Sequence, residues 1–166
     1  MKQRFLWTGL GVAVLAAAVA ISTVVLVKSN ASALPKSIRE QVTSTLIVPQ
    51  GKAVTLDRAS ATYDSQLKVL VYRVNAYGAQ VTISEQPTPD SFIDVPQVFD
   101  KIANGMQEYA KFDTDIGTVH LGRPTQIDHK QTAIMNSKGT LLFASAERDL
   151  SQDQWRQLFA NMVTIK

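Results

Sequence analysis

The chain has 166 residues, a formal net charge of +3 and no cysteine, which excludes disulfides, thiolate zinc sites and a cysteine nucleophile. Three of its 17 basic residues, Lys2, Arg4 and Lys28, lie within the first 33 residues, where no acidic residue occurs. The other 14 equal the 14 acidic residues in number, so the rest of the chain is formally neutral. Because phosphate binding requires clustered positive charge, the sequence disfavours a nucleic-acid partner.

Residues 5–27 form an apolar run without a charged side chain. At roughly 1.5 Å per residue, a helix of this length crosses the ~30 Å hydrocarbon core of a bilayer. We therefore expect a cytoplasmic tip (1–4), a transmembrane helix (5–27), a tether (28–35) and an extracytoplasmic domain (36–166). The basic residues Lys2 and Arg4 favour a single-pass protein with its N-terminus inside. The absence of cysteine favours a bacterial source, and so the inner membrane as its location.

Cleavage as a signal peptide is the alternative, because Ala31-Ser32-Ala33 has the small residues that a signal peptidase recognises. This would release a secreted domain. Against cleavage, the apolar run exceeds the ~7–15 residues of an ordinary signal peptide, and Pro35 follows the triplet closely. If the segment stays, Gly9, Ala13 and Ala17 recur every four residues and form a possible contact face for a second membrane helix.

The first half of the predicted domain begins with a short helix from Lys36 to about Thr43 and a strand-like stretch up to Val48. Two short strands are expected next, at 53–56 and 59–63. The clearest strand, 67–75, is predicted to form an antiparallel hairpin with 80–85 across a turn at 76–79. Tyr77 in this turn is the expected exposed aromatic and a possible contact residue.

In the second half, apolar spacing predicts a helix from Pro96 to about Gln107 with Asp94 as its N-cap. Strands are expected at 108–113 and 117–122, followed by a hairpin of 131–135 with 140–146. Ser151 and Gln154 form a capping box that starts a last helix, whose apolar stripe is Trp155, Leu158, Phe159 and Met162. The order of elements indicates an α+β domain, with a mainly antiparallel sheet packed by two or three helices.

No motif predicts catalysis, a cofactor or a metal. His120 is expected on an exposed strand face and His129 in a loop, so they do not converge on a metal. The stretch 113–117 resembles the start of a calcium loop, but the twelfth position, which needs an acid, is Pro124. Glu85, Asp90 and Asp94 are ordinary acids at a strand end and a helix start. We therefore do not expect an enzyme.

Short patches of the chain resemble a loose group of bacterial single-pass proteins. The patches are 35–38, 81–87, 139–142 and the helix that follows Leu150-Ser151. The chain is similar to small membrane-anchored domains and, more distantly, to extracytoplasmic domains of anti-sigma factors and lipoprotein-sensing regulators. This resemblance implies a curved antiparallel sheet with helices on one face. With four residues ahead of the membrane segment, we expect no sigma-binding domain on the inner side.

The sequence thus favours a membrane-anchored binding domain whose partner is an envelope or membrane protein. An accessory subunit of a larger membrane complex is the first alternative. A domain that binds a hydrophobic ligand between its sheet and a helix is the second, and a concave apolar pocket would favour it.

Overall fold

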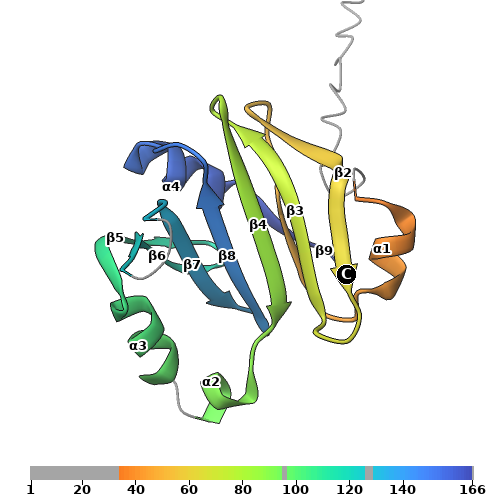
Figure 1. Ribbon diagram of the computed structural model, residues 1–166, viewed down its shortest axis with the longest axis horizontal. Coiled ribbons are helices and arrows are strands. Elements are labelled where there is room, and N and C mark those ends of the chain that lie inside the picture. The colour runs from red at the N-terminus through yellow and green to blue at the C-terminus, as the bar shows by residue number, and fades with distance from the viewer. Residues whose placement is uncertain (1–33, 95–96, 126–128, 166) are drawn as a thin grey trace, which may run out of the picture.

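The computed structural model describes residues 34–94, 97–125 and 129–165, which form an α+β domain (Figure 1). The predicted fold class and its antiparallel sheet are confirmed, although these residues form four short helices instead of two or three. The elements are α1 (Lys36–Gln41), β1 (Leu46–Pro49), β2 (Val54–Asp64), β3 (Val69–Ala76), β4 (Ala79–Pro87), α2 (Asp90–Asp94), α3 (Gln97–Asn104), β5 (Met106–Thr114), β6 (Gly117–Pro124), β7 (Thr132–Ser137), β8 (Thr140–Ala146), α4 (Gln152–Ala160) and β9 (Met162–Ile165).

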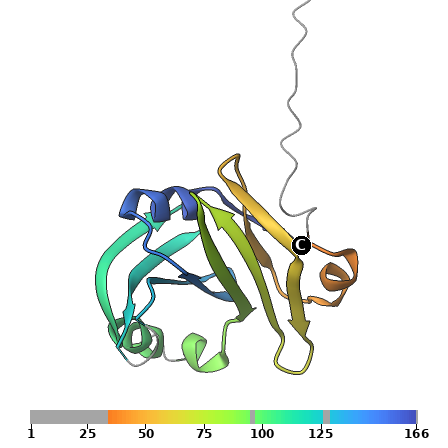
Figure 2. The same cartoon turned by 45° about the horizontal axis from the view of Figure 1, so that its top comes forward.

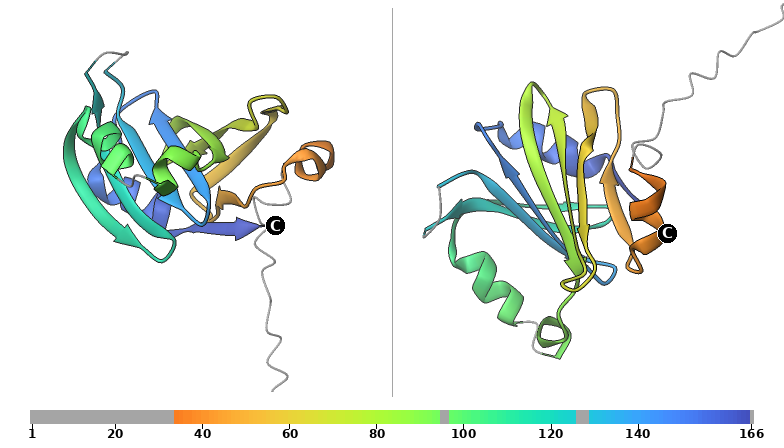
Figure 3. Two further views of the ribbon diagram at one scale, coloured as in Figure 1. Left: turned by 90° about the horizontal axis from the view of Figure 1, so that it is seen from below. Right: turned by 45° about the vertical axis from the view of Figure 1, so that its right-hand side comes forward.

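Seven strands form one antiparallel sheet in the order β2-β3-β4-β8-β7-β6-β5. It consists of two meanders, β2–β4 and β5–β8, which are joined where β4 pairs with β8. The sheet is strongly curved, so its two edge strands do not lie in one plane (Figure 3). The predicted β3–β4 and β7–β8 hairpins are confirmed. Each closes on a two-residue turn with positive φ at both positions, Tyr77-Gly78 and Lys138-Gly139, which matches the twist of the strands.

The main core lies on one face of this sheet, where period-two alternation directs apolar side chains inward. Helix α4 covers it with Trp155, Leu158 and Phe159, all fully buried, and the predicted capping box on Ser151 and Gln154 is present. The placement of Met162 on the stripe of this helix was wrong, because the helix ends at Ala160 and Met162 begins β9.

A second, two-stranded sheet pairs β1 with β9 in antiparallel register. Strand β9 was not expected from the sequence. The Thr140 hydroxyl, which is buried, donates to the Thr45 carbonyl oxygen at 2.6 Å and fixes the segment before β1 to the large sheet. Leu34 is fully buried in the main core, so the packed region already includes this residue, two positions before the expected domain boundary.

The region after β4 differs from its prediction. Asp94 is the last residue of α2 rather than the N-cap of a long helix, and α3 ends at Asn104 instead of reaching Gln107. The Gly105 amide donates to the carbonyl oxygens of Lys101 and Ile102, which ends α3 before Met106 begins β5. The two helices contact each other at one end of the sheet, with the rings of Phe92 and Phe99 6.0 Å apart (Figure 2).

The two strands expected at 53–56 and 59–63 are one strand, β2, whose register with β3 shifts between Asp57 and Thr62. The irregularity explains why the pattern looked like two strands. In the part of the chain that the structure describes, no helix is long and apolar enough to cross a bilayer. The transmembrane prediction for 5–27 and the contact residues Gly9, Ala13 and Ala17 lie outside the described residues.

Removing residues 1–33 should give a soluble, folded monomer, because the described residues contain a continuous core and two complete sheets. Circular dichroism and sedimentation velocity of the 34–166 fragment would check this expectation. Aggregation or loss of ordered structure in the fragment would show that the domain requires its N-terminal segment.

Candidate functional site

The face of the sheet opposite the main core carries a groove of about 740 Å³. Its floor includes Thr82 of β4, Ser145 of β8 and Thr132 of β7, which occupy neighbouring register positions across the three strands. Phe143 and Ile134, two residues along the same strands, extend the floor as an apolar row. Ile102 and Met106 line the groove from α3 and the start of β5, and Pro124, Thr125 and Lys130 also line it.

The groove exists because the side chains in one cross-strand row are small. Thr132 pairs with Ser145 on one side and with Gly122 of β6 on the other, so the next position of the row has no side chain. Helix α3 covers only the neighbouring apolar row: Ala103 and Met106 pack with Ile134, together with half-buried Phe99 and Phe143. Because α3 is short and the residues of the next row are small, the groove remains open between them.

Hydroxyl groups give the floor a polar strip. The Thr132 and Ser145 hydroxyl oxygens lie 2.9 Å apart and share a hydrogen bond, and Thr132 also donates to the Lys130 carbonyl oxygen at 3.3 Å. Each hydroxyl retains acceptor capacity for a ligand. Lys130, whose side chain is exposed, brings a positive charge to the lining. The groove therefore combines apolar surface with a few polar groups, as small-molecule sites usually do.

His120 is buried, which corrects the expectation that it lies on an exposed strand face. Helix α3 covers this end of the face, and the Phe99 ring meets the imidazole edge-on with ring centroids 5.5 Å apart. His129 lies in the loop before β7 as predicted, where its carbonyl oxygen accepts from Arg123 Nη1 at 2.6 Å. Within the described ranges, no group of three or more His, Cys, Asp or Glu side chains could hold a metal ion.

Glu85, expected to be an ordinary acid at a strand end, is instead buried. Its carboxylate is almost fully buried between β4 and β1, where the Ile47 amide donates to Oε2 at 2.8 Å and the Tyr72 hydroxyl lies 2.7 Å from Oε1. Burial raises its pKa to about 7, although the two hydrogen bonds oppose the change. Burial, reinforced by the neighbouring carboxylate, also raises the pKa of Tyr72 well above 10.0. This cluster joins the small sheet to the large one.

Tyr77 occupies the β3–β4 turn as predicted, with a φ of 52°. Its side chain is half-buried against the main core instead of fully exposed, and this burial raises its pKa. The Arg148 guanidinium donates to the carbonyl oxygen of Gly78 and so fixes the turn. A contact role for Tyr77 remains a prediction.

Comparison of the chain with protein-family models, with curated proteins and with solved structures gave no match. Helices pack against both faces of the sheet, α4 on the main core and α3 on the groove face, whereas the resemblance drawn from sequence patches implies helices on one face.

Proposed function

We propose that this chain is a non-enzymatic binding domain that holds an amphipathic small molecule, with an apolar tail and a polar or anionic head, in the groove on the second sheet face. The observation that carries the proposal is the groove itself. Its volume of about 740 Å³ falls within the ~300–1,000 Å³ typical of small-molecule sites.

The lining favours an amphipathic ligand over a fully polar one. Ile102, which is 39% exposed, and half-buried Phe143 offer apolar surface whose burial against a tail contributes about 25 cal/mol per Å². The hydroxyls of Thr132 and Ser145 and the ammonium group of Lys130 supply hydrogen bonds and charge for a head group. A strongly hydrated ligand would leave the apolar row in contact with polar groups, which costs free energy.

The prediction that tests this function compares two exposed apolar residues. Ile102, 39% exposed, lines the groove, whereas Leu67, 71% exposed, follows β2 outside it. Ile102→Glu should weaken binding of dansyl-undecanoic acid by about tenfold or more, because it places a carboxylate beside the tail and repels an anionic head. Leu67→Glu should leave the affinity unchanged. Fluorescence titration of the full-length chain in mild detergent gives both affinities.

The head group has its own test. Lys130→Gln should weaken binding of dansyl-undecanoic acid more than binding of its methyl ester, because only the acid carries a charge for the ammonium group. Equal affinity of the Ile102→Glu and Leu67→Glu chains for the probe, or no binding by the unmodified chain, would refute a ligand site in this groove.

The setting proposed for this site is the outer side of a bacterial inner membrane, with residues 5–27 as the anchor. The uncharged run of residues supports the anchor, and the formally neutral domain supports a ligand other than a nucleic acid. Carbonate extraction of membranes containing the tagged full-length chain tests the anchor, because an integral segment stays with the lipid whereas a cleaved domain is released.

A further inference from the structure

The edge strand β5 offers a surface that is separate from the groove. It is the last strand of the large sheet, and among the described residues it pairs only with β6. From Ala110 to Thr114 the register with β6 is unbroken. On an edge strand, alternate residues direct backbone N–H and C=O groups away from the sheet, where an added strand can pair with them.

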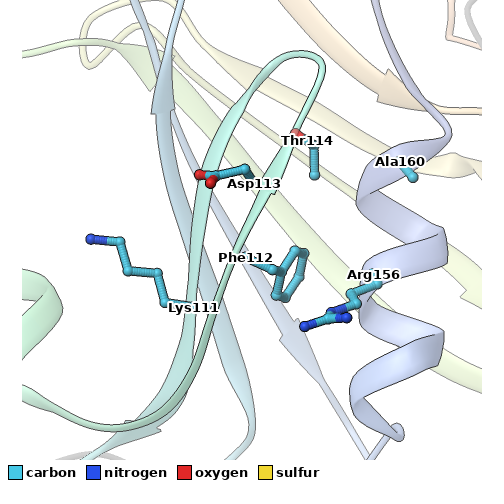
Figure 4. Close-up of a pocket in the computed structure, with 6 residues that line it drawn as sticks. All are labelled: Lys111, Phe112, Asp113, Thr114, Arg156 and Ala160. Carbon is cyan, nitrogen blue, oxygen red and sulfur yellow. The ribbon is translucent and has the colours of Figure 1, made fainter.

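A hollow of about 310 Å³ lies between this strand and α4. Phe112 and Thr114 point from β5 towards the helix, and Arg156 and Ala160 line the hollow from α4 (Figure 4). The volume suits one or two side chains of a bound segment. An edge strand next to a helix with a hollow between them is the arrangement with which several peptide-binding domains hold an extended ligand.

Arg156 determines which ligand fits. Its guanidinium carbon lies 5.6 Å from the centre of the Phe112 ring, and the side chain is exposed. Within the described ranges, no salt bridge to this guanidinium is observed. Asp113 points to the other side of the strand, where its carboxylate accepts from the Thr118 hydroxyl at 2.6 Å. The hollow is therefore positive and its walls are partly apolar.

We propose that β5 and α4 bind an extended segment of a partner protein that carries an acidic side chain. The segment adds to the sheet beside β5 through main-chain hydrogen bonds, and one of its side chains enters the hollow. Its carboxylate then forms a charge-assisted hydrogen bond with Arg156, which remains stacked on Phe112. An internal acidic residue fits better than a C-terminal carboxylate, because the charge of the site lies on a helix side chain and not in a loop of backbone amides.

The opposite edge of the sheet is less suited to the same role. Both edge strands carry a register shift, and that of β5 lies between Glu108 and Ala110, outside the regular stretch 110–114. The shift of β2 lies in the middle of the strand, between Asp57 and Thr62, where it twists the edge and interrupts a regular pairing surface. Arg73, which pairs with β2 on that side, already has Asp57 as an ion-pair partner at 3.3 Å. Of the two edges of the large sheet, only the β5 edge therefore combines a regular stretch of strand with a guanidinium that has no salt bridge within the described residues.

Three synthetic peptides test the proposal against the full-length chain in mild detergent. The first alternates Val and Thr with one central Glu, the second has Gln in place of Glu, and the third is the first with alternate amides N-methylated. Fluorescence anisotropy should show that the Glu peptide binds about tenfold more tightly than the Gln peptide. The N-methylated peptide should not bind, because it cannot form the strand ladder.

Substitutions locate the binding. Arg156→Glu should remove the preference for the Glu peptide, whereas Arg39→Glu, a matched charge reversal on the exposed side of α1, should leave it intact. Hydrogen exchange of the amides in β5 should slow when the Glu peptide is bound. Equal binding of the Glu and Gln peptides or binding that survives N-methylation would overturn the proposal. A dimer in sedimentation whose β5 amides exchange slowly without any peptide would also overturn it, because a second copy would then occupy the edge.

Discussion

The free energy of unfolding of the domain should fall by about 3 kcal/mol as the pH rises from about 4 to about 8, because Glu85 is buried as a neutral acid. The pKa of Glu85 is about 7 in the folded chain, whereas the ordinary value of 4.5 applies in the unfolded chain. Each pKa unit corresponds to roughly 1.4 kcal/mol. Between these values the folded chain binds more protons than the unfolded chain. The contribution is fully present below pH 4.5 and is lost as the pH rises through 7.

The hydrogen bonds around Glu85 explain why the neutral form fits. When the carboxyl is protonated, Oε1–H can donate to the Tyr72 hydroxyl, and that hydroxyl can donate to the Ile47 carbonyl oxygen, which lies 3.1 Å away. The Ile47 amide donates to Oε2 in both states. When the carboxyl is ionised, the Tyr72 hydroxyl must donate to Glu85, so the Ile47 carbonyl oxygen loses this donor and a charge is left in the core.

Glu85→Gln should abolish this pH dependence, because an amide of the same shape can accept from Ile47 and donate to Tyr72 without titrating. Urea unfolding followed by circular dichroism at several pH values measures the slope for both chains. Glu147→Gln is the matched control, since Glu147 is exposed and the change should leave the slope as it is. A slope that survives in the Glu85→Gln chain would assign the pH dependence to another group.

The alternation of residues in the sequence of β4 already indicates the position of Glu85. Alternation along β4 places Val81 and Ile83 on one face, and the same period of two places Glu85 on that buried face. The pattern alone does not predict this burial, because an acid at the end of an apparent strand is usually solvated. The strand in fact continues to Pro87, and β1 covers its end. A contact over 38 positions in the chain leaves no local signal.

The elements that sequence reasoning predicted well have strong local signals. The two β-turns end in glycine, and the last helix starts with Ser151 and Gln154 in a capping box. The groove could not be predicted from local sequence signals, because it depends on which strands pair and in which register. Gly122, Thr132 and Ser145 are unremarkable in sequence, and only the register of three strands brings them into one row of small residues. The pairing of β1 with β9 is also long-range, which is why Met162 was assigned to a helix.

Trp155→Ala should destabilise the domain by about 3–5 kcal/mol, the range for removing a large aromatic side chain from a core. The indole is fully buried, its ring centroid lies 6.2 Å from that of Phe159, and its Nε1 donates to the Gln131 side-chain oxygen at 2.9 Å. The same oxygen accepts from the Leu150 amide at 2.7 Å, so Trp155 and the segment before α4 share one acceptor. The substitution leaves a cavity, and the Gln131 side-chain oxygen loses one of its two donors.

Trp155→Phe separates these two contributions, because it keeps most of the ring and removes the hydrogen bond. We expect it to cost less than Trp155→Ala. Gln157→Ala, an exposed change on the same helix, should stay within about 0.5 kcal/mol of the unmodified chain. Urea unfolding followed by circular dichroism compares all three. Because Arg156 follows Trp155 on α4, losing the buried indole should also weaken binding of the Glu peptide beside β5. Equal stability of the Trp155→Ala and Trp155→Phe chains would contradict a core role for the indole.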